Sequence, residues 1–309
     1  RFRLSTVQLS VWGKTACDSP GIRQGFCICE NAAVQSHWRS YPVVFLLRGC
    51  ESAMSDFTWC DLSTFALTKA THFYGAVLDW SPYLAGGGMG DDYTIMYADG
   101  EAAAGIFTMP DFFQKIRMPS FWMTYIRVES LANSVDLAVK LGGKCEIEPT
   151  QIDANSQFAL IRDPSGAGFS LFQGLPLNGR DYLARNGRMV WSELHVPLDA
   201  EIETFYQQLF GWEFCEDQRM SCRRVVRLPS GEVIASVLKL DEATKGPKNY
   251  WAVWFATDDM PQAIRRIEPA GGNILMRPGG GHTFCMATDN QGAVFCLTDR
   301  ATFDDVTRN

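Results

Sequence analysis

The sequence predicts an α+β protein built from four strand-helix-strand-strand-strand (βαβββ) modules in tandem. Three observations predict it: a repeat that relates two halves of the chain, stretches that alternate with the period of a strand, and stretches with the spacing of amphipathic helices. Because 309 residues are long for one domain, we expect two. We place them at 54–178 and 187–301, since regular patterning begins at Met54.

The repeat has a fixed spacing of 132 residues. It relates Trp59 to Trp191 and carries five further residues of the first half onto identical or similar residues of the second. These pairs are Asp61 with Glu193, Leu62 with Leu194, Phe73 with Phe205, Tyr74 with Tyr206, and Trp80 with Trp212. Such long-period self-similarity marks duplicated structural units.

A second set of matches follows in each half. Trp122 lies 20 residues before the first glycine of Gly142-Gly143, and Trp251 lies 20 residues before that of Gly271-Gly272. Each half then ends in an aspartate, a Gly-Ala pair and an alternating apolar strand, in "RDPSGAGFSLFQ" and "TDNQGAVFCLTD". The duplication therefore covers nearly all of the patterned region.

The elements of the first half follow from local pattern. "FTWCDLST" (57–64) alternates as a strand, and apolar residues from 66 to 78 have helical spacing. Strands are expected at 93–98, 103–109 and 122–128. A helix follows at 131–141, beginning after Ser130 and ending at Gly142, which can adopt the left-handed C′ conformation. The half closes with the strands "KCEIEP", "FALIRD" and "GFSLFQ".

The second half repeats this order. The strand "MVWSELHV" (189–196) precedes a helix at 200–210, and the strands "RRVVRL" and "VIASVLKL" follow. After "WAVWFAT", Asp259 and Pro261 open a further helix that runs to the glycine pair. The strands "FCMAT" and "AVFCLT" end the half.

Charge and composition exclude several classes of partner. The chain has a net charge of −7, and the residues after 53 carry 22 Lys/Arg against 32 Asp/Glu, which argues against nucleic acid. The best candidate for a membrane span, "YPVVFLL" (41–47), is far too short to cross a membrane. The cysteines are scattered, with no CxxC pair and no signal peptide, so we expect reduced thiols and a cytoplasmic location.

Residues 1–53 show no sustained periodicity and hold four of the ten cysteines. We expect an extension without a catalytic role, of non-native or upstream origin. A native arm that packs on a partner is the alternative.

The pattern W-x-[DE]-L, then FY and a Trp, then W-x-x-Y, a GG pair and D-P-x-G-A resembles the glyoxalase/bleomycin resistance/extradiol dioxygenase (vicinal oxygen chelate) superfamily. More narrowly, it is similar to two-domain, glyoxalase-like bacterial members. The resemblance implies that βαβββ modules pair into two cup-shaped domains, each with eight strands around a cavity. It also implies, in metal-dependent members, a divalent ion held by His, Glu or Gln, which acts as a Lewis acid on a substrate oxygen.

The positions that the resemblance assigns to metal ligands are occupied by poor ligands. The first-strand position falls on Trp59 and Trp191, and the opening position of the following module falls on Met123 and Ala252. The closing position, where metal-dependent members have Glu, falls on Ser170 and Cys296. A fourth position, of uncertain register, offers Glu101 and Glu232. We therefore predict no cofactor, although a divalent metal stays open.

The opening strands nevertheless carry a distinctive set of side chains. Strand alternation places Asp61 on the face of Trp59, and it places Glu193 and His195 on the face of Trp191. A buried carboxylate needs a partner or a ligand. We predict a ligand-binding set with an aromatic-plus-carboxylate character. Strand alternation supplies Trp59, Asp61, Tyr125, Trp191, Glu193 and Trp254, and the closing position that the resemblance assigns supplies Cys296.

Two functions from different classes are consistent with these residues. The first is a metal-independent protein that binds a small aromatic or cationic molecule in such a cup. The second is a metal-dependent glyoxalase-type lyase or isomerase with a non-standard site around Glu193, His195 and Cys296. In it, Glu193 and His195 are the candidate catalytic residues and the weak candidate metal ligands. The core alternative, in which Trp59 and Trp191 only fill the interior, explains the two acids less well. On family grounds a homodimer is compatible with either function.

Overall fold

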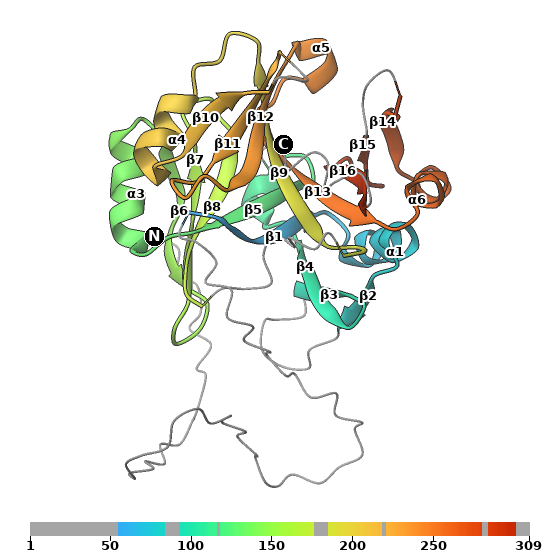
Figure 1. Cartoon of the computed structure of the whole chain (residues 1–309). Helices are drawn as coiled ribbons and strands as arrows, with labels where there is room; N and C mark the ends of the chain where they lie inside the picture. The colour runs from blue at the N-terminus through green and yellow to red at the C-terminus, as the bar shows by residue number, and fades with distance from the viewer. Residues whose placement is uncertain are drawn as a thin grey trace, which may run out of the picture. The chain divides into compact units, whose positions relative to one another are not determined.

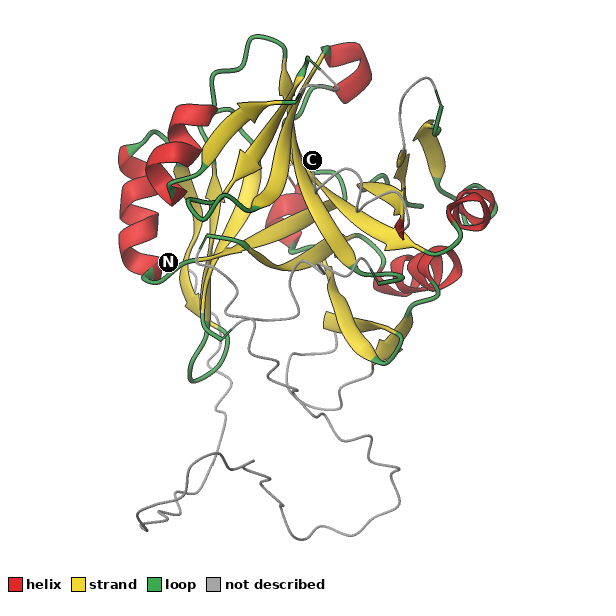
Figure 2. Ribbon diagram, viewed as in Figure 1, coloured by secondary structure: helices red, strands yellow, loops and turns green. Residues whose placement is uncertain are grey.

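Two eight-stranded sheets make up the described part of the protein (Figures 1 and 2). The computed structural model describes residues 55–83, 93–115, 118–175, 185–217, 221–279 and 284–300. The expectations for residues 1–53 lie outside these ranges. Among the described residues, no helix has the length and apolar character needed to cross a membrane.

The first sheet is built from the first half of the chain, in the order β2-β3-β4-β1-β5-β8-β7-β6. Its elements are β1 (Phe57–Thr64), α1 (Leu67–Leu78), β2 (Ser81–Tyr83), β3 (Tyr93–Ala98), β4 (Glu101–Thr108), α2 (Asp111–Lys115), β5 (Phe121–Arg127), α3 (Leu131–Lys140), β6 (Lys144–Gln151), β7 (Gln157–Arg162) and β8 (Gly168–Gln173).

The second sheet repeats that order as β10-β11-β12-β9-β13-β16-β15-β14. Its elements are β9 (Met189–Pro197), α4 (Glu203–Phe210), β10 (Glu213–Glu216), β11 (Arg223–Arg227), β12 (Val233–Leu240), α5 (Glu242–Lys245), β13 (Tyr250–Thr257), α6 (Met260–Ile267), β14 (Asn273–Met276), β15 (Phe284–Thr288) and β16 (Val294–Asp299).

The four expected βαβββ modules are confirmed, and each sheet joins two consecutive modules through their antiparallel opening strands. Within each module the opening strand also pairs in parallel with the module's last strand, as β1 does with β4. The short helices α2 and α5 are additions to this plan. The fold class is therefore α+β with two cups, as the sequence predicts.

Helix ends follow the expected capping residues in two cases and differ in one. The Ser130 and Asp259 side chains accept hydrogen bonds from backbone N–H groups of the first turns of α3 and α6. The helix expected at 200–210 instead starts at Glu203. A turn, in which the Ala200 N–H donates to the Pro197 carbonyl, precedes it and delays the helix by one turn.

The helices cover the outer faces of the sheets and pair across the two halves of the chain. Figure 1 shows α1 beside α6 and α3 beside α4, and these pairs are in contact. Apolar residues from both halves form one continuous core between the outer faces, and this core buries Tyr74, Tyr206, Trp212 and Trp251 completely or almost completely. Two smaller apolar clusters line the inner faces.

The residues of the sequence repeat lock one half of the chain to the other. The Tyr206 hydroxyl donates to Asp163 Oδ2 at 2.8 Å and accepts from Trp251 Nε1 at 3.0 Å. In the mirrored set, Tyr74 donates to Asp289 Oδ2 at 3.3 Å and Trp122 Nε1 donates to the Tyr74 hydroxyl at 2.8 Å. Each of these four buried side chains (Tyr74, Trp122, Tyr206 and Trp251) thus has a partner from the other half or from the neighbouring module.

The glycine pairs have the same architectural role. A Cβ on Gly143 would lie 3.2 Å from the Phe205 ring, and one on Gly272 would lie 2.8 Å from the Phe73 ring. The second glycine of each pair therefore makes room for a phenylalanine of the opposite half. Most residues of the repeated motif therefore hold the two halves of the chain together. Asp61 and Glu193, the acids of the opening strands, do not take part in these contacts and need a separate explanation.

Candidate functional site

The inner face of the first sheet, called cup 1 here, brings together the predicted residues Trp59, Asp61 and Tyr125. Trp59 pairs with Tyr125 across β1 and β5, and Asp61 pairs with Met123. The alternation of β1 turns Trp59 and Asp61 to this face while Leu62 enters the outer core. Sequence alternation therefore placed these three side chains correctly.

Asp61 is the centre of cup 1 and is buried. Trp59 Nε1 donates to its Oδ1 at 2.7 Å, the Tyr93 hydroxyl donates to Oδ1 at 2.8 Å, and the Tyr125 hydroxyl donates to Oδ2 at 2.8 Å. Burial raises the pKa of the Asp61 carboxyl, while these donors and the Gly105 backbone oppose that rise. All of these donors are uncharged, so the carboxylate has no counter-ion among the described residues.

Gly105 makes this arrangement possible. It faces Asp61 in the parallel pairing of β1 with β4. A Cβ at this position would overlap both the Asp61 carboxylate and the Tyr93 hydroxyl. The missing side chain is thus the space into which the acid and its tyrosine donor fit.

The inner face of the second sheet, called cup 2, places Trp191, Glu193 and His195 together as expected. Glu193 Oε2 lies 2.6 Å from Arg223 Nη2 and accepts from the Ser236 hydroxyl at 2.6 Å, while Oε1 lies 3.0 Å from His195 Nε2. Burial raises the pKa of Glu193, but Arg223, followed by His195 and Ser236, outweighs it and brings the pKa to about 2. Glu193 is therefore an ionised carboxylate with a cationic partner.

His195 connects this network to the edge of cup 2. Its Nδ1 lies 3.1 Å from the hydroxyl of Tyr250, which is half-buried. Burial raises the pKa of Tyr250 well above its ordinary value. The hydroxyl therefore stays protonated at neutral pH and serves as a hydrogen-bonding group next to His195.

The remaining predicted residues of cup 2 are Trp254 and Cys296. Trp254 pairs with Trp191 on one side and with Cys296 on the other. The Arg223 guanidinium lies over the Trp254 ring, 5.4 Å from its centroid. Burial raises the pKa of the Cys296 thiol well above its usual value, so this cysteine is a small, protonated member of the apolar lining.

The chemistry of the donor set does not fit a divalent metal. Among the described residues, no three His, Cys, Asp or Glu side chains gather into a group that could hold an ion. Glu193 and His195 touch each other, but Arg223 already occupies the same carboxylate and would repel a cation. Glu101 binds Arg185 and Arg188 at the start of β4, so its carboxylate is committed elsewhere.

Several residues of both cups carry no local signal in the sequence. Tyr93, Arg223, Ser236 and Tyr250 reach the two acids from other strands, and Gly105 supplies space. Their roles depend on the register between strands that are separated by loops of variable length. The third-strand position of each module could have drawn attention to Tyr93 and Arg223, since both begin a short strand with a polar side chain.

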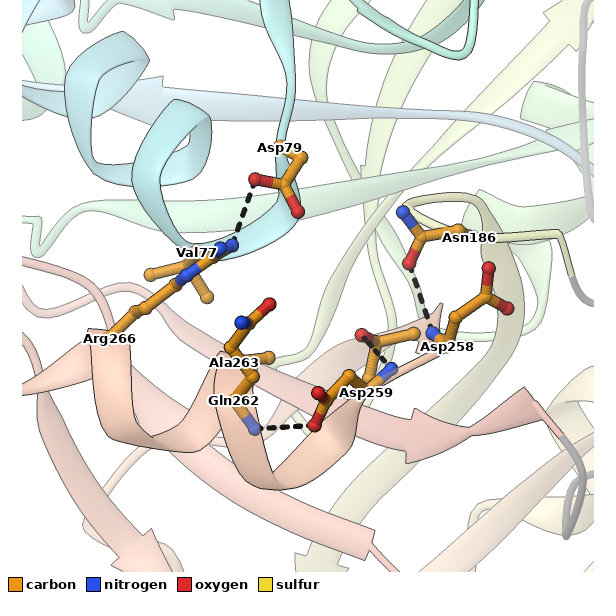
Figure 3. Close-up of a pocket in the computed structure, with 9 residues that line it drawn as sticks. Val77, Asp79, Asn186, Asp258, Asp259, Gln262, Ala263 and Arg266 are labelled. Carbon is orange, nitrogen blue, oxygen red and sulfur yellow. Dashed lines mark hydrogen bonds and ion pairs between the residues drawn. The ribbon is translucent and has the colours of Figure 1, made fainter.

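A small surface pocket of about 110 Å³ lies apart from the cups (Figure 3). Its polar groups are used within the fold: Arg266 pairs with Asp79 at 2.8 Å, Asn186 accepts from the Asp258 N–H at 3.1 Å, and Asp259 caps α6. Figure 3 shows these interactions around its wall. The pocket is therefore a junction between α1, α6 and the segment before β9.

Comparison with known proteins agrees with this geometry. Residues 193–297, which run from the acid of β9 into β16, match the family model described as the Glyoxalase/Bleomycin resistance protein/Dioxygenase superfamily. This part of the chain is therefore similar to proteins of that superfamily. The resemblance predicted from the W-x-[DE]-L and D-P-x-G-A motifs is thereby confirmed.

Two curated proteins are similar to this chain over most of its length. CFP32 of Mycobacterium tuberculosis, provisionally named a glyoxylase, is 28% identical over 246 residues and is aligned over 77% of this chain and 92% of its own length. The anthracycline biosynthesis protein DauV of Streptomyces is 22% identical over 233 residues, covering 71% of this chain and 83% of DauV.

Solved structures show the same fold at low sequence identity. The Mn(II)-bound glyoxalase of Novosphingobium aromaticivorans has a TM-score of 0.56 and 15% identity, covering 80% of this chain and 82% of that one. A homoprotocatechuate 2,3-dioxygenase variant from B. fuscum has a TM-score of 0.54 and 14% identity, covering 79% and 70%. These likenesses concern the fold, so the chemistry of this chain has to come from its own cups.

Proposed function

We propose that this chain is a small-molecule-binding protein whose cups hold planar or cationic organic compounds without a metal ion. Each cup sets aromatic rings around a carboxylate on a rigid sheet. Aromatic walls with a few placed polar groups are the usual design of a small-molecule site. Cup 1 is the better candidate for an organic cation.

The Asp61 carboxylate is the single observation that carries the proposal. It is buried among Trp59, Tyr93 and Tyr125, and its described partners are all neutral. Leaving a charge without a counter-ion in such a place is costly. A bound ammonium group would supply that charge, and the surrounding rings would add cation–π attraction.

The donor sets support binding without a metal. The first-strand positions hold Trp59 and Trp191, and the nearest acid of cup 2 is paired with Arg223. An organic ligand can use the indole rings and hydroxyls directly, whereas a divalent ion requires several oxygen or nitrogen ligands around one point.

Isothermal titration calorimetry with (2-naphthylmethyl)ammonium tests the proposal. The wild type is expected to bind this cation, and Asp61→Asn is expected to weaken binding at least about tenfold because the charge partner is lost. Asp99→Asn is the matched control, since Asp99 is exposed in the turn between β3 and β4. Equal affinity in the wild type and Asp61→Asn, or no binding by the wild type, would contradict the proposal.

A metal-dependent lyase or isomerase is the second candidate, and one observation favours it. Glu193 and His195 touch at 3.0 Å in the cup of a chain whose fold resembles a Mn(II)-bound glyoxalase. Elemental analysis together with an assay on an α-ketoaldehyde and a thiol separates the two functions. A stoichiometric divalent metal that is lost in Glu193→Gln, with turnover lost in parallel, would establish the enzyme over the binder.

A further inference from the structure

Cup 2 contains two buried donors whose hydrogen-bonding capacity is unused. Trp254 Nε1 and Arg223 Nε have no hydrogen-bond partner among the described residues, although Trp254 is only 3% exposed and Arg223 only 9%. Arg223 Nη2 differs from them, because it lies 2.6 Å from the Glu193 carboxylate. Buried N–H groups without partners are uncommon and unfavourable. By contrast, the indole N–H of Trp191, in the same cup, donates to the Ser236 hydroxyl at 2.8 Å.

The side chains that carry the two unused donors, Trp254 and Arg223, lie next to each other in cup 2. The Arg223 guanidinium stacks over the Trp254 ring at 5.4 Å, and Phe284 packs on that ring with centroids 4.4 Å apart. Both unused groups donate and neither accepts. A ligand that satisfies them must therefore bring an acceptor oxygen next to a flat ring.

The charges around Arg223 determine the ligand's charge. Glu193 lies 2.6 Å from one guanidinium nitrogen, and the buried Asp217 lies 4.0 Å from another. Arg223 is thus already balanced by carboxylates, so an anionic ligand would meet repulsion from Glu193 and Asp217. A cationic ligand would meet Arg223 itself.

We propose that cup 2 binds a neutral planar aromatic carbonyl compound, with the carbonyl oxygen accepting from the Trp254 indole N–H and the Arg223 Nε beside it. The inference rests on the proposed function and adds the ligand class of the second cup. Phe284, which packs on the Trp254 ring, is the neighbouring aromatic ring against which the ligand's ring would pack.

Equilibrium dialysis with four naphthalene probes tests this ligand class. The ketone 2-acetylnaphthalene differs from 2-isopropenylnaphthalene only in the acceptor oxygen, while 2-naphthoate and (2-naphthylmethyl)ammonium carry opposite charges. The ketone is expected to bind cup 2 at least about tenfold more tightly than the isopropenyl compound and the carboxylate. Equal binding of ketone and isopropenyl compound, or tighter binding of the carboxylate, would overturn the proposal.

Trp254→Phe locates the site, because it removes the N–H and keeps an aromatic ring. Ketone affinity is expected to fall about tenfold, while the Tm changes little because the lost donor had no partner. Trp251→Phe is the matched control from the same strand. Its N–H bonds Tyr206 in the outer core, so this variant should lose Tm and keep ketone affinity. Unchanged ketone affinity in Trp254→Phe would overturn the proposal.

A second measurement does not depend on any variant folding. In ¹⁵N-labelled wild type, one indole N–H resonance should shift downfield on adding the ketone and should not move with the isopropenyl compound. The absence of such a shift would overturn the proposal. Binding of the ammonium probe through Asp61 without ketone binding would remove this inference and leave the proposed function intact, whereas failure of both probes would remove both.

Discussion

Cup 1 and cup 2 occupy equivalent places in two copies of one sheet, yet their buried acids are stabilised by different kinds of partner. Asp61 accepts from uncharged donors, whereas Glu193 has Arg223 as a counter-ion. The third strand of the first module contributes Tyr93, and that of the third module contributes Arg223. The change from a tyrosine to an arginine donor thus leaves Asp61 without a counter-ion and gives Glu193 one.

The neighbours of the two acids changed together with the donors. The partner of Asp61 across the parallel pairing is Gly105, and the partner of Glu193 is Ser236, whose hydroxyl donates to the acid. Tyr125, which donates to Asp61, has Trp254 as its counterpart. Arg223 and Ser236 occupy the Glu193 carboxylate, and the Trp254 indole N–H has no hydrogen-bond acceptor among the described residues. The two halves therefore share the same strand arrangement, whereas the charges around their buried acids differ.

Removal of the counter-ion in cup 2 should have the largest effect. Arg223→Met leaves the buried Glu193 without its cationic partner, so the free energy of unfolding is expected to fall by about 3–5 kcal/mol. Tyr93→Phe, the corresponding change in cup 1, should cost only about 1 kcal/mol because it removes one neutral donor. Urea denaturation measures both. Similar losses in the two variants would show that the cups do not differ in the way described.

The space at Gly105 gives the next largest effect. A Cβ there overlaps Asp61 and Tyr93, so Gly105→Ala is expected to lower the free energy of unfolding by about 1–3 kcal/mol. The same denaturation series should show partial recovery in Gly105→Ala combined with Tyr93→Phe, because the phenyl ring lacks the hydroxyl that is crowded. A neutral Gly105→Ala variant would mean that the cup relaxes freely around the added methyl group.

The two acids should respond to pH with opposite signs. The folded pKa of Glu193 is lowered to about 2, so its contribution to stability is complete above the ordinary glutamate pKa and is lost as the pH falls. Between pH 6 and pH 3 the wild type should lose about 2 kcal/mol relative to Glu193→Gln.

Asp61 has a raised pKa, so the folded state holds its proton more tightly than the unfolded state does. Its effect on stability is therefore favourable at low pH and is lost as the pH rises above the ordinary aspartate value. The wild type should become less stable relative to Asp61→Asn over that rise. Urea denaturation at several pH values measures both differences, and slopes of the same sign would contradict the assignment.

The indole N–H groups give the smallest effect. Trp59→Phe removes a donor of Asp61 and should cost about 1 kcal/mol, while Trp254→Phe removes an unused donor and should cost less than about 0.5 kcal/mol. Thermal unfolding compares the two directly. A larger loss in Trp254→Phe would mean that its N–H has a partner in the fold.

The sequence predicted the modules and the faces of the opening strands because these depend on local periodicity. Trp59 with Asp61, and Trp191 with Glu193 and His195, share faces as expected. Arg223, Ser236 and Tyr93 could not be placed, because their contacts depend on strand register across intervening loops. The helix expected from 200 started later for a related reason: a local turn at Pro197 competes with the first helical turn.

The most direct test of the difference between the cups is a competition measurement on the wild-type protein. Equilibrium dialysis of 2-acetylnaphthalene would be performed without and with saturating (2-naphthylmethyl)ammonium. Two cups with separate ligand preferences predict one site for each probe and a ketone affinity that the cation does not change. Competition between the probes for one site, or failure of either probe to bind, would contradict the claim that the two cups bind different ligands.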